Sequence, residues 1–251
     1  KIYKKFGKTV NKLLNEWWDK ISTSKNIEQY KQALENYRNT LKPGDITLLG
    51  LITEGGVGLQ TANNGKYIGV LEGTKLAENV RKQRPEKLLL ATSFCKQKNI
   101  QTKQDAQAFL ENLNEKQIRK LFDYLKEKFG RDVFGQGWLY RIVSKDEIAN
   151  VKRLTEKEKL NGILGKKTFV PYDKGDKDGN RWYAPTPYYI NWSRENVKFL
   201  KENSGKKGEG MPVVRNTQFY FREGFCWTDV NSTYLKSRIK ENGIYDVLTM
   251  S

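Results

Sequence analysis

The chain has 251 residues and only two cysteines, so it is long enough for a buried core without disulfides, and small disulfide-rich proteins are excluded. Histidine is absent, which excludes Ser-His and Cys-His nucleophile pairs and the usual ligands of catalytic zinc. The 46 Lys and Arg residues against 29 Asp and Glu give a formal net charge of +17, so a polyanionic partner such as nucleic acid is expected.

The sequence predicts a cytoplasmic protein without a membrane partner. No apolar run approaches the roughly 20 residues that span a bilayer, and no signal-peptide pattern opens the chain. Cys95 and Cys226 match no zinc or redox spacing, which fits a reducing compartment. Because the chain begins with Lys1 and stops directly after a strand-like run, we interpret it as part of a longer polypeptide.

In chain order, apolar residues at helical spacing predict amphipathic helices over about 10–21 and 27–41. A short strand at 46–52, a turn-rich run at 55–65 and a strand at 66–71 follow. Helical periodicity returns from 102 to 164. Three capping pairs support it: Thr102 with Asp105, Ser144 with Glu147, and Thr155 with Glu158.

After residue 166 the pattern changes to short extended runs rich in aromatic residues. They predict strands at 168–172, 188–192, 218–221, 225–228 and 245–248, with one helix near 193–200. The lysine-rich loop 202–210 is expected at the surface. The predicted fold class is therefore α+β: a mixed or antiparallel sheet region with functional loops, N-terminal helices (1–44) and a helical insertion (99–165).

Three familiar chemical motifs are absent or incomplete. Phe6-Gly7-Lys8-Thr9 lacks the earlier glycine of a phosphate-binding loop. The acidic run 173–179 lacks the terminal carboxylates of a calcium loop, so a solvated turn is favoured over a metal site. No Asn or Asp followed by Pro-Pro and an aromatic residue occurs, so we expect no catalytic activity and no bound cofactor in this chain.

Polar side chains are instead concentrated in loops. Amides suit adenine edges, whereas lysine and arginine suit guanine and phosphate. The first loop could equally be a structural turn with hydrogen-bonding caps. Aromatic residues flank the later cations, and for Trp182, Trp192 and Trp227 a core position is favoured over base stacking. The candidate DNA-binding residues are Gln60, Thr61, Asn63, Asn64, Lys66, Lys174, Arg181 and Arg215.

Three segments together resemble a family. The run 58–68 is similar to the Gly-x-x-Thr-Gly-x-Asn-x-x-Phe signature that opens the target-recognition (TaqI-like specificity) region of adenine-specific DNA methyltransferases. Two residues depart from the family: Ala62 stands where glycine is expected, and Gly65 where an acid is often found. Segments 169–192 and 221–246 resemble that region's second and third blocks. The nearest relatives would be type IIG restriction-modification enzymes and the methyltransferase of BREX phage-defence systems.

The resemblance implies that 45–98 and 166–251 are the two parts of a target-recognition domain that binds double-stranded DNA. It also implies an N-terminal methyltransferase domain of the same polypeptide, absent here, which uses S-adenosylmethionine to methylate N6 of a flipped adenine. Whether this bacterial parent also cleaves DNA stays open. The alternative is a protein-interaction or scaffold domain with a basic, solvated surface; RNA binding is a third, which would expose aromatics on a sheet face.

Overall fold

The computed structural model describes residues 12, 15, 27–43, 45, 55–130, 140–174, 187–208, 210–227, 237–240, 242–246 and 248–250. The chain divides into two compact units, residues 1–55 with 250–251 and residues 56–249. In the first unit, helix α2 (Ile27–Thr40) confirms the second predicted helix, and Leu34 packs there against Tyr30 and Tyr37. Most of the first predicted helix and all of the predicted strand 46–52 lie outside the described residues.

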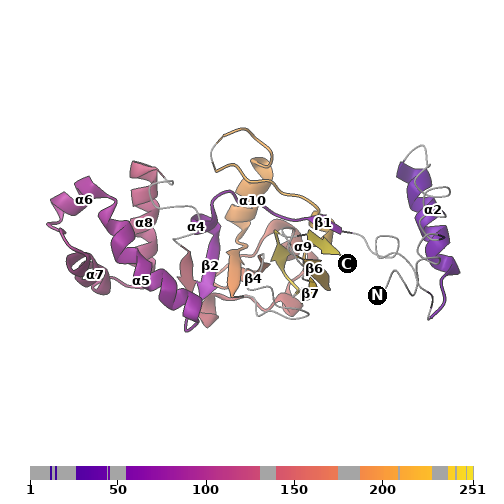
Figure 1. The fold of residues 1–251 in the computed structure, drawn as a ribbon, viewed down its shortest axis with the longest axis horizontal. Helices are drawn as coiled ribbons and strands as arrows, with labels where there is room; N and C mark the ends of the chain where they lie inside the picture. Colours follow the sequence, from indigo (N-terminus) through magenta and orange to yellow (C-terminus); the bar gives the residue numbers. More distant parts are fainter. Residues whose placement is uncertain are drawn as a thin grey trace. The chain divides into compact units, whose positions relative to one another are not determined.

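A five-stranded mixed sheet organises residues 56–249 (Figure 1). Strand β5 is antiparallel to both β2 and β4, whereas β3 and β8 add parallel strands at the two edges. The order is β3-β2-β5-β4-β8, and the strands are β2 (Ile68–Leu71), β3 (Arg141–Val143), β4 (Phe169–Asp173), β5 (Tyr188–Asn191) and β8 (Ile244–Tyr245). The α+β class with a mixed sheet is therefore confirmed.

The main hydrophobic core lies on this sheet and under helix α10 (Arg194–Glu202). Helix α10 begins where the sequence predicts, because the Ser193 hydroxyl accepts a hydrogen bond from the backbone N–H of Asn196. Its Val197 and Leu200 are buried against the sheet residues, and Trp192 is only 3% exposed, which confirms a core position for that tryptophan. Trp182 and the side chain of Trp227 lie outside the described part of the chain.

A second sheet, in the order β1-β9-β6-β7, is formed by β1 (Gly55–Val57), β9 (Leu248–Met250), β6 (Gly224–Trp227) and β7 (Ser237–Lys240). A buried ion pair joins it to the first sheet. The carboxylate of Asp173 in β4 accepts from the Arg238 guanidinium in β7, and each side chain is 4% exposed. The Cys226 thiol donates to the other Asp173 oxygen over 3.2 Å. Loss of one charge alone would leave the other buried and uncompensated, which destabilises a fold.

Four helices of residues 75–129 have a hydrophobic core of their own, built around Leu88, Leu110 and Phe122. They are α5 (Lys75–Leu89), α6 (Thr92–Gln97), α7 (Lys103–Glu111) and α8 (Glu115–Phe129). Smaller elements follow: η3 (Lys145–Glu147), η4 (Val151–Arg153) and α9 (Glu156–Asn161). All three predicted capping pairs are confirmed as reciprocal capping boxes, at the starts of α7, η3 and α9.

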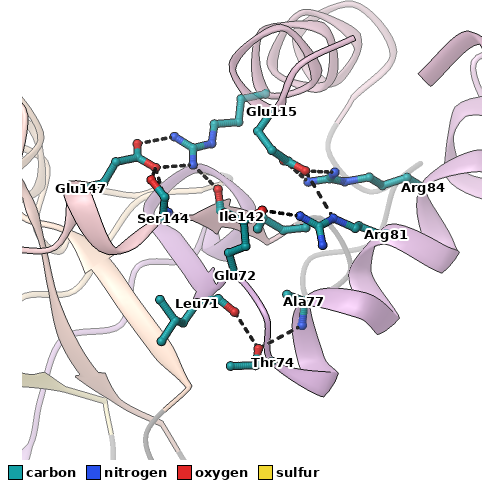
Figure 2. A network of polar contacts seen from close by, with 11 residues as sticks. Leu71, Glu72, Thr74, Ala77, Arg81, Arg84, Glu115, Ile142, Ser144 and Glu147 are labelled. Atoms are coloured by element: carbon teal, nitrogen blue, oxygen red, sulfur yellow. Dashed lines mark hydrogen bonds and ion pairs between the residues drawn. The ribbon is translucent and has the colours of Figure 1, made fainter. Parts of the chain in front are cut away.

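Arginine–carboxylate pairs join these helices to one another and to the residues that follow β2 and β3, and Figure 2 shows most of these pairs. Arg84 of α5 binds Glu115 of α8 through two hydrogen bonds of 2.8 Å, while Arg81 binds Glu72 at the end of β2 over 2.7 Å. Arg119 of α8 forms a bidentate pair with Glu147. Bidentate geometry restricts orientation as well as distance, so the helical part is held in a defined position beside β2 and β3.

Three local predictions are corrected. The segment 218–221 is not a strand: η5 (Thr217–Phe219) and a turn occupy it, because the aromatic side chains that suggested a strand reach the core from a tight turn. Residues 64–67 form a single helical turn, α4 (Asn64–Tyr67), before β2 begins. The helices of the middle region start at Lys75 rather than near 102. Among the described residues, no helix has the length and apolarity needed to cross a membrane.

Candidate nucleic-acid interface

The turn-rich run 58–67, here called the recognition loop, is fixed at its start by close backbone contacts. An alanine Cβ at Gly58 would lie 2.0 Å from the carbonyl oxygen of Tyr245, so only glycine fits there. The next residue, Leu59, is fully buried, and its N–H donates to the same Tyr245 oxygen over 2.7 Å. The Tyr172 hydroxyl donates to the Leu59 carbonyl over 2.8 Å. The beginning of the loop is therefore locked onto β4 and β8.

An internal hydrogen bond shapes the middle of the loop. The Thr61 hydroxyl donates to the Asn64 side-chain oxygen over 2.6 Å, and Thr61 is only 1% exposed. Between them Ala62 takes a φ of 49°, in the left-handed region that favours glycine. The buried Tyr67 ends the loop, and burial raises its pKa to about 12, so it stays a neutral phenol. Thr61 thus acts inside the loop and does not face a partner.

Gln60 and Arg215 are brought near each other although they are far apart in sequence. Gln60 pairs with Val213 through two backbone hydrogen bonds of 2.9 Å in an antiparallel bridge. Arg215 follows two residues after Val213, and both Gln60 and Arg215 are exposed. An amide and a guanidinium therefore lie on neighbouring segments at the surface.

Lys66 is exposed on α4 and is oriented by two aromatic rings. Its ammonium nitrogen lies 4.9 Å from the ring centre of Phe199 in α10 and 5.4 Å from that of Tyr67. The two rings stack on each other with centres 6.4 Å apart. Sequence analysis missed Phe199, because its spacing on α10 is that of an ordinary core-facing residue; only the fold shows that it supports a loop lysine.

Asn63 is half-exposed and precedes α4 without a side-chain hydrogen bond that caps this helical turn. Asn64 is also half-exposed, but its oxygen is already engaged by Thr61. Because the acceptor of Asn64 is in use, its amide N–H groups are the part left to face a partner. Asn63 is accordingly the better placed of the two loop asparagines to contact a base.

Lys174 lies in a different environment. Its ammonium pairs with the Asp246 carboxylate over 3.1 Å, and the lysine side chain is 26% exposed. Burial raises the pKa of Asp246, while Lys174 beside it opposes that rise. Lys174 therefore compensates a buried carboxylate, and its charge is partly neutralised before any partner arrives. Arg181, the remaining candidate, lies outside the described residues.

The recognition loop thus presents Gln60, Asn63 and Lys66 to solvent, with Arg215 alongside. These groups donate and accept hydrogen bonds and supply positive charge, which is the chemistry of base edges and phosphates. Among the described residues, no group of three or more Cys, Asp or Glu side chains could hold a metal ion. The arrangement suits recognition of an anionic partner.

Comparisons with known proteins give no independent identification. No protein-family model matches the chain. A search of curated proteins likewise finds no significant match.

Proposed function

We propose that the chain is the DNA target-recognition fragment of a site-specific adenine-N6 DNA methyltransferase from a bacterial restriction-modification or phage-defence system. Its role would be to hold duplex DNA and read its sequence for a catalytic domain elsewhere in the polypeptide. That domain would bind S-adenosylmethionine and methylate an adenine flipped out of the duplex. A cytoplasmic location belongs to this proposal.

The observation that supports it best is that some residues of the recognition loop shape its backbone, whereas others are exposed to solvent. Gly58, Thr61 and Asn64 match the family signature, and Tyr67 stands at the position of its Phe. These residues shape the loop through close contact, hydrogen bonding and burial. Even at Ala62, where the signature has glycine, the backbone keeps a positive φ. Of the intervening positions, Gln60 and Lys66 are exposed and Asn63 is half-exposed, whereas Leu59 and Gly65 are buried. A loop that holds a few polar side chains toward a partner would have this arrangement.

The charge of the chain supports a polyanionic partner but does not by itself define the interface. Exposed lysines also occur far from the recognition loop along the chain, for example Lys82 in α5, Lys96 in α6 and Lys120 in α8. General electrostatic attraction and specific contact must therefore be separated by experiment. Phosphate contacts act on all sequences alike, whereas base contacts discriminate among them.

Duplex binding at increasing salt, measured by fluorescence anisotropy on a mixed-sequence DNA, tests the proposal. The logarithm of the affinity should fall linearly with the logarithm of salt concentration, with a slope of about −0.9 for each phosphate contacted. Lys66→Gln should weaken binding to all sequences and reduce the slope by about one contact, while the matched control Lys96→Gln in α6 should change it less. A flat salt response of the unmodified chain would reject DNA binding and favour the protein-interaction alternative.

A further inference from the structure

A cavity of about 360 Å³ lies between α9, α10 and the segment 214–222. Its volume is in the range of sites for small molecules. Apolar and aromatic side chains form most of the wall: Leu160, Trp192, Val197, Leu200, Tyr220 and Phe221. The rings of Tyr220 and Phe221 each meet Trp192 edge-on, with centres 6.0 Å apart. The cavity thus has a fixed aromatic side.

One wall of the cavity is made by a backbone segment bounded by two unusual residues. Asn216 has a φ of 51° and Phe221 a φ of 58°, both in the left-handed region. For a bulky residue such as Phe221 this conformation is a genuine outlier that costs on the order of 1–3 kcal/mol. Hydrogen bonds hold both ends, from the Asn216 amide to Val57 and from the Phe221 N–H to Gly243. Strain of this kind is concentrated at ligand-binding sites.

The rim of the cavity has a net positive charge, since Lys159, Lys201 and Arg222 line it together with one carboxylate, Glu156, which pairs with Lys159 over 2.7 Å. Lys201 of α10 lines it and donates to the carbonyl oxygen of Leu160 over 2.6 Å. Since a carbonyl is neutral, this bond orients the ammonium without cancelling its charge. Burial lowers the pKa of Lys201 because it disfavours the charged ammonium, and an anion beside the ammonium would offset this effect. Arg222 also lines the cavity, and the exposed Gln218 adds an amide that can donate and accept.

We propose that this cavity binds a nucleotide, with the base against Tyr220 and Phe221 and the phosphate at Lys201. An aromatic wall, an amide and an oriented cation match the three parts of a nucleotide: its π-face, its hydrogen-bonding edge and its anion. The choice of a nucleotide among aromatic anions rests on the proposed function. The nucleotide could be free in solution or displaced from a bound duplex, and both sources offer the same chemistry.

The test follows the indole Nε1–H resonance of Trp192, which donates to the Lys159 carbonyl beside the cavity over 2.9 Å. Thymidine and deoxyadenosine 5′-monophosphates are titrated into the 251-residue chain, with the nucleosides and inorganic phosphate as partial ligands. The nucleotides should shift this resonance saturably and at lower concentration than either partial ligand. Lys201→Gln should lower the affinity for the nucleotide by about fivefold, which corresponds to a loss of roughly 1 kcal/mol of binding free energy.

Lys198→Gln is the matched control, because Lys198 is exposed on the same helix and does not line the cavity. It should leave nucleotide affinity unchanged. A duplex with a one-nucleotide bulge distinguishes the sources: a Trp192 shift with the bulged but not the fully paired duplex identifies DNA as the source, and a shift with mononucleotides alone identifies the free nucleotide. Both results support the site.

Absence of a Trp192 shift with every nucleotide and duplex would overturn the inference, as would equal nucleotide affinity of the unmodified chain and Lys201→Gln. Failure of the proposed function gives a different result. If neither duplex binds but mononucleotides still shift the Trp192 resonance saturably, the proposed DNA target recognition is rejected, whereas the proposed nucleotide site is supported.

Discussion

Replacing Gly58 by alanine tests whether the start of the recognition loop is locked as the structure indicates. The new Cβ would lie 2.0 Å from the Tyr245 carbonyl oxygen and within 2.7 Å of two ring carbons of the same residue. Because the nearest atom is backbone, rotation of a side chain cannot relieve the clash. The loop must move away, which breaks the 2.7 Å hydrogen bond from the Leu59 N–H to Tyr245 and exposes part of Leu59.

The expected loss of unfolding free energy follows from these contacts. One backbone hydrogen bond contributes about 1 kcal/mol, and exposing a fully buried leucine costs about 1.5–3 kcal/mol. The lower entropy of alanine in the unfolded chain offsets about 0.4–1 kcal/mol. Gly58→Ala should therefore destabilise the fold by about 1.5–3.5 kcal/mol, measured by urea unfolding followed with tryptophan fluorescence and circular dichroism.

Gly73→Ala provides the matched control. Gly73 has a φ of 80° and no atom within 4 Å of the added Cβ, so the substitution strains the backbone without a clash. Its expected cost is about 1 kcal/mol. If Gly58→Ala proves as mild as Gly73→Ala, the close contact with Tyr245 does not fix the loop, and the structural reasoning for the site is wrong.

Two further predictions concern charged side chains that pair within the fold. Arg238→Met leaves the Asp173 carboxylate buried and uncompensated, so it should lower the free energy of unfolding by about 3–5 kcal/mol. Adding Asp173→Asn should recover much of this loss, as measured by urea unfolding. A double variant as unstable as Arg238→Met would contradict the importance of the pair. For Glu147, burial alone would raise the pKa, but hydrogen bonds from Arg119 and Ser144 outweigh it and hold the pKa below its usual 4.5. Its contribution to stability is present above pH 4.5 and is lost as pH falls through the lower pKa of the folded state. Glu147→Gln should therefore flatten the acid side of a plot of melting temperature against pH, and an unchanged slope would show that Glu147 does not contribute.

Local features of this fold could be predicted because short segments determine them. The capping box of Thr102 and Asp105 depends on two side chains three residues apart, and β4 and β5 have the aromatic and β-branched composition of strands. The sequence does not predict helix α5, because this helix is polar and contains Pro85, and its pairing with neighbouring elements, such as that of Arg84 with Glu115, forms only in the fold. Tertiary packing there overrides a weak local signal.

The candidate site was predictable as a set of residue types but not as a geometry. The sequence predicts that the loop amides and cations can contact DNA, and Gln60, Lys66 and Arg215 are exposed in the fold. It could not show that Thr61 is used within the loop or that Lys174 is paired with Asp246, since both depend on partners brought close by folding. Because of these contacts, Gln60, Lys66 and Arg215 are better candidates for DNA contact than Thr61 and Lys174.

The central proposal, that the recognition loop reads DNA sequence, is tested most directly by selecting bound duplexes from a random pool and sequencing them. The unmodified chain should enrich a defined site. Gln60→Ala or Asn63→Ala should relax the preference at individual base pairs by about 1–3 kcal/mol each, while the matched control Gln97→Ala, an exposed amide in α6, should leave the site unchanged. Enrichment of no site by the unmodified chain, or the same site for all three variants, would contradict the proposal.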